Sequence, residues 1–232
     1  MNINRLLNII KPNRKYQKTY SQMGEDLIIK SYFNSIQVFT PSYIDLGAFD
    51  PFNLSNTALF YESGSNGINI EPNPLKYSKF LKYRHNDINL NIGIGTKNGE
   101  MNYYMMSSPV LNTFSIEQAK ECEAKWGYKI LDVIPVQVRP LSWVIQNYCP
   151  NKFPDFLSID IEGEEEEIVN EIKTFGSLPS VICIETLTFA IGSGGVKRRD
   201  LIDSIVSFGF EIYADTHLNT ILVRNNSNNF RK

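Results

Sequence analysis

The sequence contains few cysteines and histidines, and this scarcity excludes several kinds of site. Its 232 residues include three cysteines and two histidines. The cysteines, Cys122, Cys149 and Cys183, are an odd number without CxxC or CxxH spacing, so neither a disulfide framework nor a structural zinc site is indicated. We therefore expect a reducing, cytoplasmic setting.

Long apolar runs and an excess of one charge are also missing. The longest apolar stretch, 181–191, is too short to cross a bilayer and carries Glu185. The first ten residues lack the apolar region and the cleavage site of a signal peptide. Lys and Arg number 23 against 25 Asp and Glu, a formal net charge of −2, which gives no global attraction to nucleic acid. We expect neither a membrane span nor a nucleic-acid partner.

Short β-rich runs alternate with helical patterns along most of the chain, which predicts a parallel sheet with crossover helices. Expected strands are 43–46, 67–70, 88–94, 156–160 and 181–185, and expected helices are 22–35, 54–62, 75–83, 164–175 and 196–208. A less regular stretch, 99–150, has edge-strand patterns at 100–106 and 134–138 around a helix at 116–126. The last two strands, 210–213 and 220–224, are linked so closely that they must form an antiparallel hairpin.

An acidic turn after the first strand gives the strongest indication of a ligand. Gly47 stands where a glycine lets the chain turn and lets a ligand approach the backbone. Glu71 ends the next strand, where a carboxylate can accept hydrogen bonds from ribose hydroxyls. The pyrophosphate fingerprint GxGxxG is missing. Asp45 and Asp50 would repel a diphosphate but suit a ligand with an ammonium and a sulfonium group, which favours S-adenosylmethionine (SAM) over NAD or FAD.

Five motifs occur in a characteristic order: SQMGED (21–26), YIDLGA (43–48), SNT (55–57), GINIEPNP (67–74) and FLSIDIEGE (156–164). Together they resemble the FkbM-type methyltransferases, which are SAM-dependent O-methyltransferases of sugar and polyketide pathways. The resemblance extends over residues 20–224. It implies an α/β, Rossmann-like class I methyltransferase fold, with a seven-stranded, mostly parallel sheet, an antiparallel closing strand and helices on both faces.

The resemblance also assigns roles in cofactor binding. Asp45 and Gly47 would line the methionine end, Glu71 would hold the ribose, and Ile92 would pack on the adenine. Residues 1–40 would form a helical cover over the cofactor. The full set of implied cofactor-binding residues is Gln22, Gly24, Glu25, Asp45, Gly47, Asn56, Glu71, Pro72, Ile92 and Asp160.

Two carboxylates end the fourth and fifth strands and are candidates for catalysis. Asp160 and Glu185 should point into the crevice at the carboxyl edge of the sheet. In one arrangement they coordinate Mg²⁺ or Mn²⁺, which lowers the pKa of the acceptor hydroxyl, a placement similar to that in catechol-type O-methyltransferases. In another, His217 or Asp160 takes the proton directly. A third reading is structural: Asp160 and Glu162 only stabilise the start of the following helix.

The acceptor is expected to bind in the irregular regions 101–113, 125–139 and 189–199. Lys197, Arg198 and Arg199 could bind the phosphates of a nucleotide-linked or phosphorylated sugar, or could simply form an exposed helix start. We expect one domain, 1–232, with 99–150 as an inserted acceptor region. The expected partner is a small carbohydrate acceptor, and a homodimer is left open.

Two other functions fit parts of the pattern. The chain could be a catalytically silent SAM-binding partner subunit, because binding residues alone do not require turnover. It could also be a nicotinamide-dependent oxidoreductase, although the missing GxGxxG fingerprint speaks against this.

Overall fold

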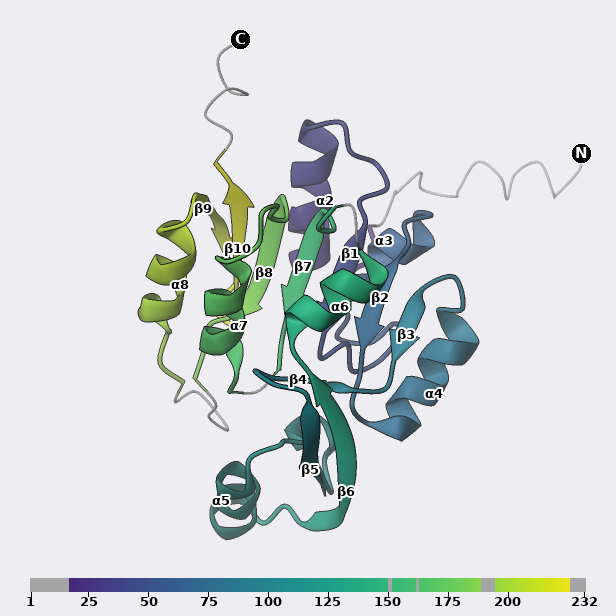
Figure 1. Ribbon diagram of the computed structural model, residues 1–232, viewed down its shortest axis with the longest axis vertical. Helices are drawn as coiled ribbons and strands as arrows, with labels where there is room; N and C mark the ends of the chain where they lie inside the picture. The colour runs from purple at the N-terminus through teal and green to yellow at the C-terminus, as the bar shows by residue number, and fades with distance from the viewer. Residues whose placement is uncertain (1–16, 150–151, 162, 189–194, 226–232) are drawn as a thin grey trace, which may run out of the picture.

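The computed structural model describes residues 17–149, 152–161, 163–188 and 195–225, and its centre is a seven-stranded sheet (Figure 1). The strand order is β3-β2-β1-β7-β8-β10-β9. All pairings from β3 to β8 are parallel, whereas β10 runs antiparallel to both of its neighbours. The bounds are β1 (Tyr43–Leu46), β2 (Gly67–Ile70), β3 (Ile88–Leu90), β7 (Phe156–Ile159), β8 (Val181–Glu185), β9 (Phe210–Asp215) and β10 (Asn219–Arg224). This confirms the predicted fold class.

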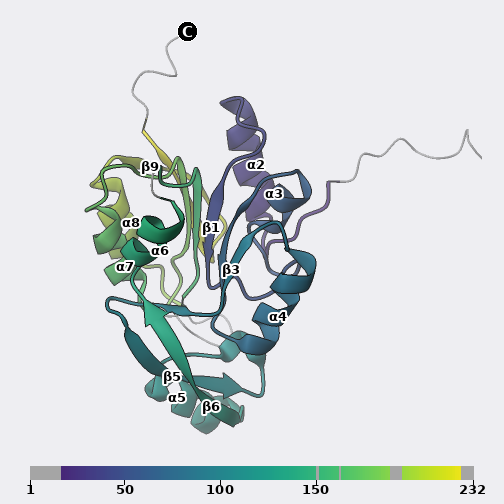
Figure 2. The same ribbon diagram turned by 45° about the vertical axis from the view of Figure 1, so that its right-hand side comes forward.

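Helices cover both faces of the sheet because successive strand side chains point to opposite faces. In β8, Ile182 and Ile184 belong to one apolar core, and Val181 and Cys183 belong to another. The first core is completed by α6 (Leu141–Tyr148), α7 (Glu165–Ile172) and α8 (Arg199–Val206), and the second by α2 (Glu25–Ser35) and α3 (Ala58–Glu62) (Figures 1 and 2). The N-terminal helix α2 is thus part of a layer on the sheet.

Residues 93–139 form a small sheet of their own, which lies at the end of the large sheet where the parallel strands finish (Figure 1). Its strands have the order β4-β6-β5. Its elements are β4 (Gly93–Ile94), β5 (Gly99–Met106), the 3₁₀ helix η1 (Pro109–Leu111), α5 (Ile116–Trp126) and β6 (Ile130–Arg139). The expected single strand 88–94 is therefore wrong: it divides into β3 of the large sheet and β4 of the small one. The two expected edge strands pair with each other, antiparallel.

Local sequence signals explain where the elements near the carboxyl edge begin. Asn73 caps α4 (Pro74–Tyr83): its side chain accepts hydrogen bonds from the backbone N–H groups of Leu75 and Lys76, which helix geometry otherwise leaves without partners. Pro74 stands at the first helical position, where its fixed φ suits a helix and its missing N–H costs nothing. The cap thereby fixes the turn that follows β2.

No helix within the described part of the chain is long and apolar enough to cross a membrane. Several predictions fall outside the described residues: the segment 1–16 of the expected cover, Glu162, and the part 189–194 of the expected acceptor region.

Candidate functional site

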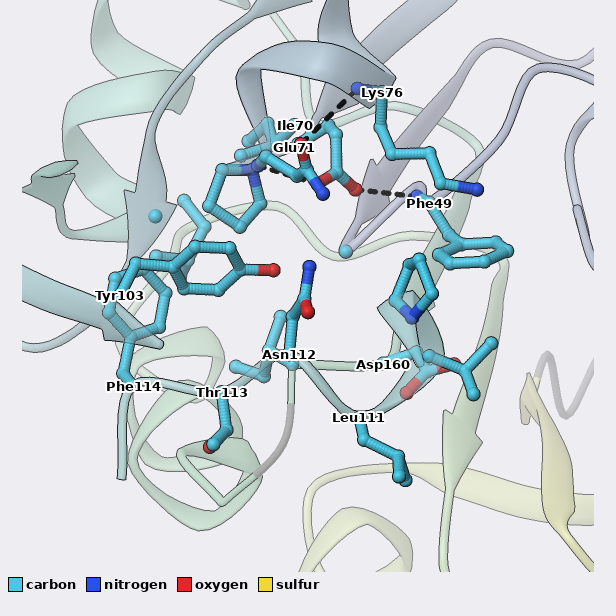
Figure 3. A pocket seen from close by; sticks show the side chains of 18 of the residues that line it. Phe49, Ile70, Glu71, Lys76, Tyr103, Leu111, Asn112, Thr113, Phe114 and Asp160 are labelled. Atoms are coloured by element: carbon cyan, nitrogen blue, oxygen red, sulfur yellow. Dashed lines mark hydrogen bonds between the residues drawn. The ribbon is translucent and has the colours of Figure 1, made fainter. Parts of the chain in front are cut away.

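A cavity of about 450 Å³ lies between the carboxyl edge of the large sheet and the inserted region. The turns after β1, β2 and β7 form one side, and Tyr103 of β5 and the segment 109–114 form the other. Figure 3 shows the Tyr103 hydroxyl and the Asn112 amide pointing toward the same space as the Glu71 carboxylate. The predicted residues that line this cavity are Gln22, Gly47, Glu71, Pro72, Ile92, Asp160 and Glu185.

Glu71 is held rigidly at the edge of the cavity. It is 4% exposed, and its two carboxylate oxygens accept hydrogen bonds from the backbone N–H groups of Phe49 (2.8 Å) and Asn73 (2.7 Å). Burial raises the pKa of Glu71 to about 7, against the lowering effect of these two hydrogen bonds and of the charge on Lys76. Because each carboxylate oxygen has a second lone pair, the group can still accept hydrogen bonds from a ligand diol.

Gly47 allows two backbone segments to meet beside the cavity. Its φ is +78°, and a Cβ at this position would lie 1.8 Å from the carbonyl oxygen of Asp160. A side chain is therefore excluded by space as well as by conformation. The Gly47 and Ala48 N–H groups both donate to the Ile70 carbonyl at 3.0 Å, which ties the β1 turn to the end of β2.

Asp160 and Glu185 meet at the cavity and share a hydrogen bond between their carboxyl groups. Asp160 is exposed where it faces the cavity, yet protein atoms surround it. The pKa of Asp160 is raised to about 6: burial raises it most, the hydrogen bond with Glu185 lowers it, and the negative charges of Glu165 and Asp45 raise it. Two carboxyl groups in contact hold a proton between them more readily than two separate ones.

The pair does not extend to a metal-ligand cluster within the described ranges. No group of three or more His, Cys, Asp or Glu side chains that could hold a metal ion occurs there. Two carboxyl groups that bond to each other fall short of the oxygen-rich set that Mg²⁺ or Mn²⁺ takes from a protein. The predicted metal role of Asp160 and Glu185 is therefore not supported, and no catalytic step is assigned to a metal here.

Asp45 and Asn56 do not line the cavity. Strand alternation turns Asp45 toward α3, where it is 4% exposed and accepts a hydrogen bond from the Thr57 hydroxyl at 2.7 Å. The Asn56 amide donates to the Ser158 hydroxyl at 3.1 Å. Neither residue is part of the lining described above, so any effect of Asp45 on a ligand acts through its charge and through the turn that follows it.

The N-terminal segment contributes one lining residue and one anchor. Gln22 lines the cavity, and Gly24, with φ +89°, precedes α2 in a left-handed conformation. Glu25 is fully buried and accepts hydrogen bonds from the Thr216 hydroxyl (2.7 Å) and the Asn219 amide (3.0 Å). Burial alone would raise the pKa of Glu25, but these hydrogen bonds and one from the Met23 backbone lower it. Glu25 thus fastens α2 to the closing hairpin.

The other predicted residues make contacts away from the main cavity. His217 is exposed at the hairpin turn with φ +76°. Lys197 donates to Asp215 (2.9 Å) and to the His217 carbonyl (2.9 Å). Arg198 pairs with Asp200 at 2.8 Å, and Arg199 is exposed at the start of α8. Phosphate binding by these cations therefore stays a prediction, because Lys197 and Arg198 already have carboxylate partners.

A second cavity of about 140 Å³ adjoins the first, and Glu185 lines both. Gln118 of α5 and Arg198 contribute to its wall, together with Leu187 and Thr188 after β8. A ligand in this cavity would contact Glu185 without contacting Glu71, which lines only the first cavity.

Sequence reasoning missed three contributors to the site. Phe49 has φ +55°, and the Lys76 ammonium lies 3.6 Å from the centre of its ring. Arg84, to which no sequence motif pointed, is fully buried. The spacing of Arg84 to Asp87, three residues along, is the one sequence signal that could have indicated an ion pair.

The arrangement suits a cationic cofactor with a ribose. Carboxylates of Glu71, Asp160 and Glu185 surround the cavity, and Lys76 is the one basic side chain among its described lining residues. Gly47 provides the close backbone approach, and Glu71 provides the diol acceptor. These residues fit SAM, which supplies an electrophilic methyl group on a positively charged sulfur.

Comparisons with known proteins agree with this geometry. The model of the methyltransferase FkbM domain matches residues 45–212. No curated protein shows significant similarity to the sequence.

Solved structures with a related fold share little sequence with the chain. A TehB-like SAM-dependent methyltransferase from Corynebacterium glutamicum is 10% identical, with a TM-score of 0.45 and 96% of each chain covered. Monomeric WbdD is 10% identical with a TM-score of 0.47, over 96% of this chain and 48% of WbdD. A Burkholderia thailandensis 1,6-didemethyltoxoflavin-N1-methyltransferase with bound S-adenosylhomocysteine is 9% identical with a TM-score of 0.42, over 87% and 77%.

The five motifs, the acidic cavity and the match to the family model lead to one conclusion: the chain belongs to the FkbM family of SAM-dependent methyltransferases.

Proposed function

We propose that the protein is an O-methyltransferase that methylates a hydroxyl group of a sugar or a related metabolite, with the Asp160–Glu185 pair as its general base. The observation that carries this proposal is the contact of these two carboxyl groups at a wall shared by two cavities. The cofactor would occupy the larger cavity and the acceptor would enter from the smaller one.

The chemistry requires an acceptor oxygen in line with the methyl group and a place for its proton. The oxygen forms a bond to the methyl carbon, the bond from that carbon to sulfur breaks, and the hydroxyl proton passes to the carboxylate pair. With its pKa raised to about 6, the Asp160 carboxyl group is mainly ionised at neutral pH and can accept a proton. A base in this range assists transfer as the hydroxyl becomes acidic in the transition state.

The rates of methyl transfer by the Asp160→Asn and His217→Asn variants, each compared with wild type, show which of the two predicted bases acts. Purified protein would be given methyl-labelled SAM and a panel of free and nucleotide-linked sugars, with products detected by mass spectrometry. Asp160→Asn should lower the rate at saturating SAM by about a hundredfold or more, the usual contribution of a general base. His217→Asn should leave the rate unchanged, because asparagine tolerates the left-handed turn.

Three results would contradict this proposal. Loss of transfer in His217→Asn alone would make His217 the base, despite its exposed position. SAM binding without transfer to any member of the panel would favour a silent SAM-binding subunit, and binding of NAD in place of SAM would favour an oxidoreductase.

A further inference from the structure

A buried network connects Arg84 to Asp45, on the face of the sheet opposite the α6–α8 layer. Arg84 is fully buried and pairs with Asp87 through its Nε at 2.9 Å. Its Nη1 donates to the Pro51 carbonyl at 3.1 Å. Its guanidinium also lies 4.6 Å from the centre of the Tyr61 ring. A buried arginine with this many partners is fixed in place, because its charge would be costly anywhere without them.

One nitrogen of this guanidinium is directed at the core of the sheet. Nη2 lies 2.7 Å from the Tyr43 hydroxyl, 3.2 Å from the Thr57 hydroxyl and 3.3 Å from the Asn69 amide oxygen. The Tyr43 hydroxyl in turn donates a hydrogen bond to Asp87 at 2.7 Å. The Thr57 hydroxyl donates a hydrogen bond to a different carboxylate, Asp45, at 2.7 Å.

Thr57 therefore forms a relay of two hydrogen bonds from a cation to a carboxylate. An N–H that donates to a hydroxyl strengthens the bond which that hydroxyl donates in turn. Thr57 precedes α3, but its side chain makes no capping hydrogen bond; besides Arg84 and Asp45, its hydroxyl has the Ser55 hydroxyl at 3.4 Å.

Asp45 needs such support because its surroundings oppose a negative charge. Burial raises the pKa of Asp45, whereas the Thr57 hydrogen bond, the charge on Arg84 and a hydrogen bond from Ser158 lower it. The charge of Asp45 in turn acts on the carboxyl groups of Glu71 and Asp160, which line the cavity. The titratable and charged groups that act on Asp45, or on which it acts, are Glu71, Arg84, Asp87, Asp160 and Cys183.

We propose that Arg84 is a positioning residue for cofactor binding, which holds the Asp45 carboxylate charged and in place through the Thr57 hydroxyl. Asp45 then contributes negative charge behind the Gly47 turn, toward the cationic end of the cofactor, without touching it. This inference rests on the proposed binding of SAM in the cavity.

Thr57→Val and Thr57→Ser form the test, with SAM itself as the ligand. Valine keeps the size and branching of threonine but removes the hydroxyl, whereas serine keeps the hydroxyl. The dissociation constant of SAM would be measured by calorimetry from about pH 6 to about pH 9 for both variants, the wild type and Asp45→Asn. We compare the two variants by the ratio of their dissociation constants, Thr57→Val over Thr57→Ser. The titration of Glu71 and Asp160 affects SAM binding in both variants and therefore cancels in this ratio.

The expected ratio is about ten near neutral pH, the loss of one hydrogen bond to a charged group. It should fall toward one as pH rises, because Asp45 regains its charge without the relay. Thr57→Val should approach Asp45→Asn at the acid end. A ratio of one throughout, or a ratio above one that does not change with pH, overturns the proposal, since a purely structural defect would not follow a titration.

The wild-type measurement separates this inference from the function on which it rests. If the wild type does not bind SAM, the proposed function fails and takes the positioning role with it. If the wild type binds SAM and the ratio stays flat, the positioning role alone is wrong. Thermal unfolding of both Thr57 variants, expected as one cooperative transition above the temperature of the binding assay, confirms that they are folded.

Discussion

Glu71→Gln tests whether the folded protein holds a carboxyl group with a strongly raised pKa beside the cavity. In the folded state the pKa of Glu71 is raised to about 7, from an ordinary value of 4.5. The folded protein therefore holds this proton more tightly than the unfolded chain does. Its contribution to stability is complete below the unfolded pKa and is lost as pH rises through the folded one.

The size of the effect follows from the shift. A difference of this size corresponds to about 3 kcal/mol in total, of which about 2.5 kcal/mol is lost between about pH 5 and about pH 8. Glutamine does not titrate, so the free energy of unfolding of Glu71→Gln, relative to wild type, should rise by that amount over this interval. A separate loss of about 1–3 kcal/mol, the same at every pH, is expected because one amide oxygen cannot accept from both Phe49 and Asn73.

Urea unfolding of the cofactor-free protein at a series of pH values measures this difference. Glu211→Gln serves as a control, because Glu211 is exposed on the edge strand β9. A stability difference between Glu71→Gln and wild type that stays constant from about pH 5 to about pH 8 would refute the reasoning, whatever its absolute value.

Two further substitutions test the turns that frame the cavity. Gly47→Ala should lower the free energy of unfolding by much more than the cost of a left-handed alanine, about 1–2 kcal/mol, because its Cβ would meet the Asp160 carbonyl. Gly64→Ala, with φ +93° and no neighbour within 4 Å, should show only that conformational cost. Equal losses for the two variants in urea unfolding would count against the close approach at Gly47. Asn73→Ala should lower the free energy of unfolding by about 1 kcal/mol through loss of the α4 cap, and Asn73→Ser should restore most of it; the same loss in both would mean that the side chain does not cap.

The central strands could be predicted from sequence because their environment is uniform. The bounds of β1, β2 and β8 agree with the expected ranges 43–46, 67–70 and 181–185. Each is a short, almost continuously buried run that ends at a polar or glycine turn, which is typical of central strands of a parallel sheet. Their order follows from the crossover helices between them.

The position of the inserted region could be predicted from the sequence, but the pairing of its strands could not. Its main strand, β6, pairs with β4 on one side and β5 on the other, and such pairings depend on partners far along the chain. The stretch 141–148 reads as irregular in isolation, yet it forms α6 because Leu141 and Val144 find an apolar core to pack on.

In the site, too, positions set by local sequence could be predicted, whereas those set by contacts between distant residues could not. Gly47, Glu71 and Asp160 lie where strand ends predicted them, around one cavity. Asp45 alternates to the opposite face, although the sequence places it in the same motif. The burial of Arg84 depends on Tyr43, Thr57 and Asn69, which come together only in the fold.

A crystal structure of the protein with S-adenosylhomocysteine tests the central claim most directly, namely that the cavity at the carboxyl edge binds the cofactor. We predict that the ligand fills this cavity, with its ribose hydroxyls within hydrogen-bonding distance of the Glu71 carboxylate and its sulfur facing the Asp160–Glu185 pair. A ligand bound elsewhere, or a ribose held by other residues, would contradict the account.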